Sequence, residues 1–191
     1  MIRFSAGNVI EAAWIIWTVW WLVAATRQNA VKKREPGGEW LLRWIVLIVA
    51  MALFFRPGSY LGVLNERFIP YNTLVRDAGA ALTCAGLAFS IWARQHIGRY
   101  WSGTVSLRVD HQLIRTGPYS RIRHPIYTGI LLALVGTVLA DGHYRVIVAF
   151  AFVLAGLTWK AWSEENLLSH EFGPAFEEHK RHTGFFLPRL S

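Results

Sequence analysis

Long apolar runs separated by short polar stretches dominate this sequence. Five such runs occur, at Val9–Ala25, Leu41–Phe55, Thr73–Ala93, Ile126–Ala140 and Tyr144–Trp162. Crossing a bilayer core takes about 20 helical residues, so flanking residues must extend the shorter runs. The stretch Trp40–Phe55 contains a single charge, Arg43, and shows no polar face at the helical period. The pattern therefore predicts an all-α integral membrane protein with about five transmembrane helices, in preference to a soluble helical bundle.

The last two runs are separated by Asp141-Gly142-His143 alone. So short a break predicts a tight antiparallel helical hairpin. The hairpin would bring the start of the fourth helix, at His124–Gly129, beside the end of the fifth, at Lys160–Glu165. Beyond the membrane surface we expect the fifth helix to continue to a Gly173-Pro174 stop, followed by a short cytoplasmic tail helix, Ala175–His182.

We interpret the 191 residues as one membrane domain. Residues 1–93 would form three transmembrane helices, and residues 94–191 would form the cofactor-binding and catalytic region. The formal net charge of +8 would suggest nucleic acid in a soluble protein, but in a membrane protein it marks loops that face anionic lipid. Fifteen of the 20 Lys and Arg residues border the first connection, the third connection and the carboxyl end. The positive-inside rule places these segments in the cytoplasm, in a cell (inner) membrane.

Metal and thiol chemistry receive little support from the sequence. The single cysteine, Cys84, lies inside an apolar run, so neither an intramolecular disulfide nor a cluster of zinc-binding thiolates is expected. Among the histidines, His179-x-x-His182 alone has metal-ligand spacing, and we interpret it as part of a solvated tail. No metal and no nucleic-acid partner are therefore expected. The Trp-rich first helix is interpreted as a packing and anchoring surface.

Polar, cationic and turn-forming residues crowd into residues 111–129, directly against an apolar run. Gly117-Pro118 predicts a turn, and Pro125 predicts the first turn of a helix. The free N–H groups of that helix, together with Arg123 and His124, would attract a carboxylate, a phosphate or the carboxyl end of an amino-acid cofactor. Simple anchoring of these cations to anionic lipid is the alternative.

Glu164 and Glu165 form an acidic pair at the predicted cytoplasmic end of the fifth helix. Negative charge is unfavourable at the carboxyl end of a helix, so a compensating partner is expected. Arg123 or His124 across the hairpin is one candidate, and a bound cation such as a sulfonium or an amino group is the other. On the residues alone, a structural salt bridge and a ligand contact are equally supported.

The two motifs together resemble a known family. His111-x-Leu113-Ile-x-x-Gly117-x-Tyr119, then Arg123-His124-Pro125-x-Tyr127-x-Gly129, a hydrophobic hairpin and the Glu164-Glu165 pair are similar to motifs of the isoprenylcysteine carboxyl methyltransferases. Phospholipid N-methyltransferases are similar more distantly. The resemblance covers roughly residues 94–190, and two motifs at this separation across a hairpin form a specific signal.

The resemblance implies S-adenosylmethionine in a cytoplasm-facing pocket and a lipid-like or prenylated acceptor from the membrane. The cofactor-binding residues that it implies are His111, Leu113, Tyr119, Arg123, His124, Tyr127, Glu164 and Glu165. Those that it implies near the reacting groups are Tyr127, Lys160 and Glu164, and the charge of Arg94 makes it a fourth candidate catalytic residue. Lys160 replaces an arginine of the family, keeping the charge but losing the planar fork that grips a carboxylate. Lys160 or Arg94 could orient a carboxylate acceptor, and Glu164 could take the proton of an amine.

The sequence thus predicts an S-adenosylmethionine-dependent membrane methyltransferase. Methyl transfer from a sulfonium requires alignment and exclusion of water, for which positioning can contribute about 7–11 kcal/mol. The alternatives are a phospholipid or amine N-methyltransferase and a non-catalytic membrane transport or binding protein. A transporter should show broken helices near mid-membrane in corresponding halves of a repeat, whereas the ionisable residues here gather at one face.

Overall fold

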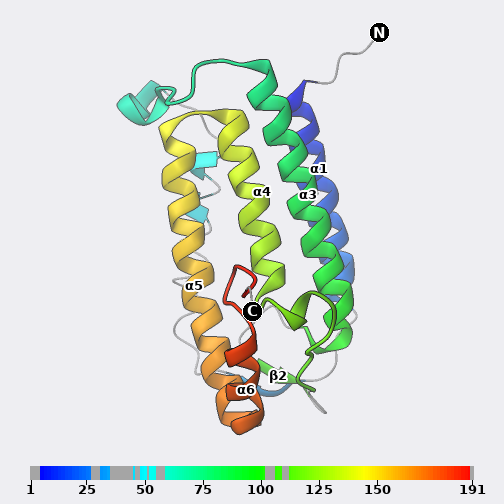
Figure 1. The fold of residues 1–191 in the computed structure, drawn as a ribbon. Coiled ribbons are helices and arrows are strands. Elements are labelled where there is room, and N and C mark those ends of the chain that lie inside the picture. The colour runs from blue at the N-terminus through cyan, green and yellow to red at the C-terminus, as the bar shows by residue number, and fades with distance from the viewer. Residues whose placement is uncertain are drawn as a thin grey trace.

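Long helices lie side by side in this computed structural model, which describes residues 5–26, 31–34, 45, 48–50, 52–54, 59–101, 106–108 and 112–189 (Figure 1). The long helices are α1 (Ala6–Ala25), α3 (Thr73–Ile97), α4 (Pro125–Asp141) and α5 (Tyr144–Phe172). The shorter helical elements are η1 (Ser59–Asn65), η2 (Gly98–Tyr100), η3 (Gly117–Ser120) and α6 (Pro174–His182).

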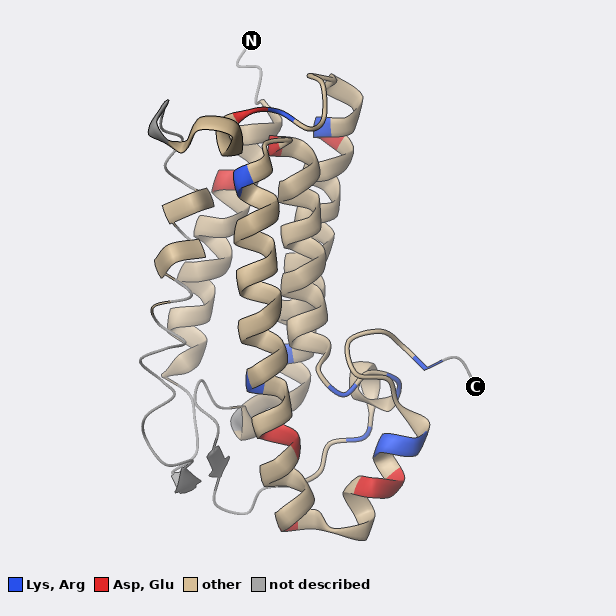
Figure 2. Cartoon of the chain, turned by 90° about the vertical axis from the view of Figure 1, so that its left-hand side faces the viewer, with Lys and Arg blue, Asp and Glu red and all other residues tan. Residues whose placement is uncertain are grey.

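The predicted all-α membrane class is confirmed. Three of the helices, α1, α3 and α5, are long and apolar enough to cross a membrane, and α4 is a shorter apolar helix of 17 residues. In the second apolar run, residues 45, 48–50 and 52–54 are helical. The total of five transmembrane helices stays a prediction. Charged residues gather toward the two ends of the bundle, as Figure 2 shows.

The predicted hairpin between α4 and α5 is also confirmed. Gly142 ends α4 with φ of 75°, a left-handed conformation that glycine adopts without strain. Its N–H donates to the carbonyl of Val138 at 2.9 Å, and its own carbonyl accepts the N–H of Phe68. The chain therefore reverses at Asp141–His143 and returns α5 antiparallel to α4 (Figure 1).

Small residues allow α3 and α4 to approach closely. A Cβ atom on Gly86 would lie 2.4 Å from the backbone nitrogen of Ala133, and one on Gly79 would lie 2.6 Å from the carbonyl oxygen of Gly136. Thr83 adds a hydrogen bond between the helices, from its hydroxyl to the carbonyl of Ala133. In a membrane, where apolar side chains gain little by leaving lipid, such close packing holds helices together.

The Trp-rich helix α1 packs against α3 and α4 through polar pairs as well as apolar contacts. The indole N–H of Trp17 donates to Ser90 at 2.7 Å, and that of Trp14 donates to Thr137 at 3.1 Å. Trp21 contacts the ring of Trp101 edge-on, with ring centroids 5.2 Å apart. Helix α1 therefore reaches residues next to the site described below.

Two short strands were not predicted from the sequence. Strands β1 (Val31–Arg34) and β2 (Ser106–Arg108) pair antiparallel and join the first connection to the third. A second link, the parallel bridge between Ile122 and Gly184, ties the carboxyl-terminal segment to the same end of the bundle. The three segments rich in Lys and Arg therefore lie at one end of the molecule.

Candidate active site

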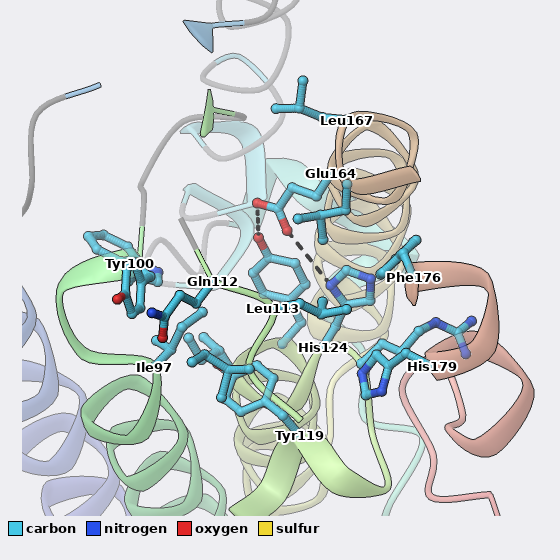
Figure 3. Close-up of a pocket in the computed structure, with 16 residues that line it drawn as sticks. Ile97, Tyr100, Gln112, Leu113, Tyr119, His124, Glu164, Leu167, Phe176 and His179 are labelled. Atoms are coloured by element: carbon cyan, nitrogen blue, oxygen red, sulfur yellow. Dashed lines mark hydrogen bonds and ion pairs between the residues drawn. The ribbon is translucent and has the colours of Figure 1, made fainter. Parts of the chain in front are cut away.

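A cavity lies where the start of α4, the end of α5 and helix α6 meet, close to the carboxyl end of α3 (Figure 3). Six of the predicted site residues line it: Leu113, Tyr119, Arg123, His124, Tyr127 and Glu164. Further walls come from residues that the sequence did not assign to the site, namely Ile97, Tyr100, Trp101, Gln112, Ile114, Ile126, Leu167, Leu168, Phe176 and His179. One further predicted site residue, His111, lies outside the described residues.

The motif at the start of α4 is held in place by the carboxyl-terminal segment. The backbone N–H groups of Arg123 and His124 donate to the carbonyls of Gly184 and Phe185, at 2.9 and 3.3 Å. The hydroxyl of Thr128, one turn into the helix, donates to the carbonyl of Phe186. Residues 58 to 61 positions later in the chain thus fix the backbone from which the motif side chains project.

Glu165 forms the structural salt bridge. Its Oε1 atom lies 2.5 Å from Nε of Arg123 and accepts a hydrogen bond from Nε2 of His124 at 3.1 Å. The Arg123 side chain also donates from Nη1 to the carbonyl of Thr183. The prediction that Arg123 or His124 compensates the acidic pair across the hairpin is therefore confirmed, and both residues share the task for Glu165.

Glu164 instead faces the cavity. Tyr127 donates to its Oε1 atom at 2.7 Å, while Nδ1 of His124 lies 3.7 Å from its Oε2 atom (Figure 3). The His124 ring therefore lies between the two carboxylates, stacked parallel on the ring of Tyr127 with centroids 5.5 Å apart. Glu165 does not line the cavity, so the structure places the two neighbouring glutamates in different surroundings.

Tyr119 forms part of the opposite wall and is buried. Its hydroxyl donates to the carbonyl of Ala93 at 3.4 Å. Burial raises the pKa of the Tyr119 phenol far above its usual value, and the negative charge of Glu164 raises it further, against a smaller opposite effect of Arg94. Tyr119 therefore presents a neutral phenol at any physiological pH.

The two predicted catalytic cations lie behind the cavity wall. Lys160 has its Nζ 3.9 Å from Oε1 of Glu164 and 5.5 Å from the centroid of the Tyr127 ring. Arg94 is buried, donates to the carbonyls of Gly98 and Ala24, and lies 4.3 Å over the ring of Trp101. Neither cation lines the cavity. Arg94 contacts the cavity wall through Trp101, and Lys160 contacts it through Glu164 and Tyr127.

His179 corrects one expectation. The sequence analysis placed it with His182 in a solvated tail, which is wrong for His179: this residue is 7% exposed and lines the cavity. The side chain of His182 is 71% exposed, as expected. The signal that was missed is the spacing of Phe176 and His179, which puts both on one face of α6. Burial and the positive charges of Arg115 and Arg123 lower the pKa of His179.

The arrangement suits a ligand that carries both charge and flat or apolar groups. Glu164 offers negative charge, Arg123 and the histidines offer donors, and the remaining wall is aromatic and aliphatic. The described residues that line the cavity include no Ser, Thr or Cys. Positioning and electrostatic stabilisation are means that such a wall offers.

The fold and the site together define a helical membrane protein with a ligand cavity at one end of its bundle. Residues 79–170, which include the start of α4, the hairpin and the acidic pair, match the isoprenylcysteine carboxyl methyltransferase (ICMT) family. The chain is therefore similar to members of this family over that segment.

Two similar proteins carry names that refer to metal resistance. The nickel-cobalt-cadmium resistance protein NccN of Alcaligenes xylosoxydans xylosoxydans is 38% identical over 101 residues, which are 50% of this chain and 45% of that protein. The cobalt-zinc-cadmium resistance protein CzcN of Cupriavidus metallidurans is 36% identical over 98 residues, 50% of this chain and 44% of that protein.

A third similar protein is named as an enzyme. The protein-S-isoprenylcysteine O-methyltransferase of Schizosaccharomyces pombe is 27% identical over 162 residues, which are 77% of this chain and 67% of that protein. The chain thus spans less than half of the two resistance proteins and about two thirds of the third.

Proposed function

We propose that this protein transfers a methyl group from S-adenosylmethionine to a lipid-like or prenylated acceptor in the membrane, in the manner of an isoprenylcysteine carboxyl O-methyltransferase. The observation that carries the proposal is the Glu164 carboxylate, which faces the cavity with Tyr127 bonded to it, between aromatic and aliphatic walls. This pair lies inside the segment that matches the family.

The residues of the cavity fit the methyl donor. S-adenosylmethionine supplies a methyl group on a positively charged sulfur, which is an activated donor. Glu164 would attract the sulfonium and the amino group, and Arg123 and His124 would attract the carboxylate. The apolar wall around Leu113 and Ile114 would pack against the adenine.

The role of Tyr127 is to hold Glu164 in one orientation. Its hydroxyl uses one carboxylate oxygen at 2.7 Å, which leaves Oε2 for a ligand. The Tyr127 ring is fixed in turn by stacking on His124, whose Nε2 is held by Glu165. A carboxylate that is oriented before the ligand binds costs no reorganisation during the reaction, so it stabilises positive charge more strongly than a mobile one.

A carboxylate acceptor needs no base, because it attacks the methyl group in its ionised form. Lys160, 3.9 Å from Glu164, would attract such an acceptor from the side of α5, with one ammonium in place of a planar fork. Trp159 and Trp162, next to it on the same helix, are 40% and 60% exposed and would face the lipid that brings the acceptor.

Amine N-methylation is the second candidate. An attacking amine must lose a proton, and the Glu164 carboxylate faces the cavity with one oxygen that accepts no hydrogen bond from Tyr127. The lysine at position 160 also fits this candidate, because repulsion between two ammonium groups would favour the neutral, nucleophilic form of the amine.

We place the active site on the cytoplasmic side of a cell (inner) membrane. The support is the distribution of charge: 15 of the 20 Lys and Arg residues border the first connection, the third connection and the carboxyl end. Strand pairing and the bridge from Ile122 to Gly184 gather these segments at the end that contains the cavity.

The test uses the purified full chain in lipid nanodiscs. Isothermal titration with S-adenosylmethionine measures binding, and mass spectrometry after incubation with methyl-labelled cofactor measures transfer to a short prenylcysteine peptide and to phosphatidylethanolamine. A base-labile methyl ester on the peptide supports the proposal, and methylated lipid amine supports the second candidate. A folded sample that binds no cofactor refutes both and favours a transport or binding protein.

A further inference from the structure

His179 is a buried polar side chain whose ring contacts the ring of Phe176. It comes from α6, is 7% exposed and lines the cavity beside Phe176. In the part of the chain that the structure describes, neither ring nitrogen of His179 forms a hydrogen bond, although its backbone carbonyl accepts one from Thr183. Because His179 lines the cavity, a ligand bound there can contact its ring.

The charges around His179 indicate the sign of that ligand. Two guanidinium groups in the segment before α4, those of Arg115 and Arg123, lower the pKa of His179. His182, on the same helix, lowers it as well, and Glu165, on α5, raises it. Glu165 is already paired with Nε of Arg123, and Nη1 of Arg123 donates to Thr183. Nη2 of the same guanidinium forms no hydrogen bond with any described residue. The corner formed by Arg123 and His179 therefore offers donors to an anion.

The negative and positive parts of the cavity wall are separated. Figure 3 shows His124 between Glu164 and His179. Nδ1 of His124 lies 3.7 Å from Glu164, whereas its Nε2 bonds Glu165, the carboxylate that pairs with Arg123. A zwitterionic amino-acid group matches such a wall, with its cationic end toward Glu164 and its carboxylate toward His179.

We infer that His179 and Arg123 form the subsite for the α-carboxylate of the methyl donor, which makes α6 a cofactor-binding element. The inference rests on the proposed function and deepens it. It extends the site beyond residues 79–170, the segment that matches the family.

The donor rather than the acceptor is the source of this carboxylate, because of where α6 lies. Gly173 and Pro174 turn the chain away from α5, and six of the nine residues of α6, Glu177 to His182, have ionisable side chains. A segment this polar belongs in water. The lipid-like acceptor would approach from the apolar side of α5, where Lys160 lies.

The experiment compares two donors on the full chain in nanodiscs. S-adenosylmethionine and its decarboxylated analogue differ in the carboxylate alone, so the ratio of their affinities isolates that contact. We expect His179→Ala to weaken binding of S-adenosylmethionine roughly 10- to 100-fold, the range for a hydrogen bond to a charged group. Binding of the decarboxylated analogue should change less than about threefold.

Two variants serve as controls. His182→Ala removes an exposed imidazole from the same helix and should leave both affinities unchanged. His179→Gln retains a side-chain N–H donor, so it should recover part of the lost affinity, and it replaces the alanine variant if that variant loses its thermal unfolding transition.

The outcomes separate the inference from the proposed function. Equal loss of affinity for both donors in the His179 variants, or no loss for either, overturns the carboxylate subsite while the cofactor site stands. A carboxylate-dependent loss that appears only when the acceptor is present assigns the subsite to the acceptor and also overturns it. Failure of the unaltered protein to bind S-adenosylmethionine overturns the proposed function itself.

Discussion

Replacing Glu165 by glutamine should mainly lower the stability of the fold, whereas replacing Glu164 by glutamine should mainly weaken binding of the methyl donor. Glu165 is nearly buried, lies 2.5 Å from Nε of Arg123 and accepts from His124 at 3.1 Å. Breaking a buried pair by removing one charge typically costs about 3–5 kcal/mol. Because the amide oxygen of glutamine can still accept one hydrogen bond, we expect about 3 kcal/mol for Glu165→Gln, at the lower end of that range.

The change at Glu164 should be milder for the fold. Its side chain is 23% exposed, and a glutamine oxygen can still accept the hydrogen bond of Tyr127. We expect Glu164→Gln to cost less than about 1 kcal/mol of stability. If this carboxylate holds the positive charge of the methyl donor, its loss should weaken binding by about 1.5–3 kcal/mol, or roughly 10- to 150-fold.

Thermal unfolding and titration calorimetry on the same nanodisc samples measure both effects. For a chain of this size, 1 kcal/mol corresponds to about 2–4 °C in Tm, so Glu165→Gln should lower Tm by about 6–12 °C. Glu164→Gln should shift it by less than about 4 °C. Equal falls in Tm for the two variants, or an unchanged Tm for Glu165→Gln, would refute the division of roles argued here.

Three further predictions concern other parts of the molecule. Gly86→Ala should lower stability by about 1–3 kcal/mol, because its Cβ would lie 2.4 Å from the Ala133 nitrogen; Gly7→Ala, whose Cβ meets no atom closer than 3.7 Å, is the control. Lys160→Met should reduce turnover more than cofactor affinity, while Lys160→Arg retains turnover; equal losses in both quantities for Met would contradict an acceptor-side role. Lowering the pH below about 6.5 should destabilise the protein, because burial and two nearby guanidinium groups lower the pKa of His179 in the folded state. Below that pH the unfolded chain binds more protons than the folded chain, which favours unfolding. His179→Gln should reduce this loss of Tm on acidification, and an unchanged pH profile would exclude His179 as its source.

The sequence was sufficient for those parts of the protein that depend on local pattern. Apolar runs of near-membrane length predicted the helices, and the three-residue break at Asp141–His143 predicted the hairpin. The hairpin in turn predicted that the His124 motif meets the Glu164–Glu165 pair, and both salt-bridge distances agree with this. These predictions succeed because helix length, helix ends and a short turn are set by neighbouring residues.

Contacts between distant residues decided the rest. Adjacent helical side chains point about 100° apart, so the rotation of α5 against α4 determines that Glu164 faces the cavity while Glu165 pairs with Arg123. Arg94, predicted as a candidate catalytic residue, is held over Trp101 by the carbonyl of Ala24 from α1. A residue's own neighbours in sequence carry no information on either arrangement.

The carboxyl-terminal helix shows the same limit most clearly. Its sequence, with acidic and basic residues on one short amphipathic helix, suits a solvated tail as well as a docked one. The segment that follows the helix is docked by backbone hydrogen bonds: Arg123 and His124 donate to Gly184 and Phe185, and the carbonyl of Arg121 accepts from Gly184. The sequence alone therefore determined the helices, the hairpin and the motifs that meet. The tertiary structure decided which side chains face the cavity and added His179 to it, because that choice depends on how elements rotate and pack across the bundle.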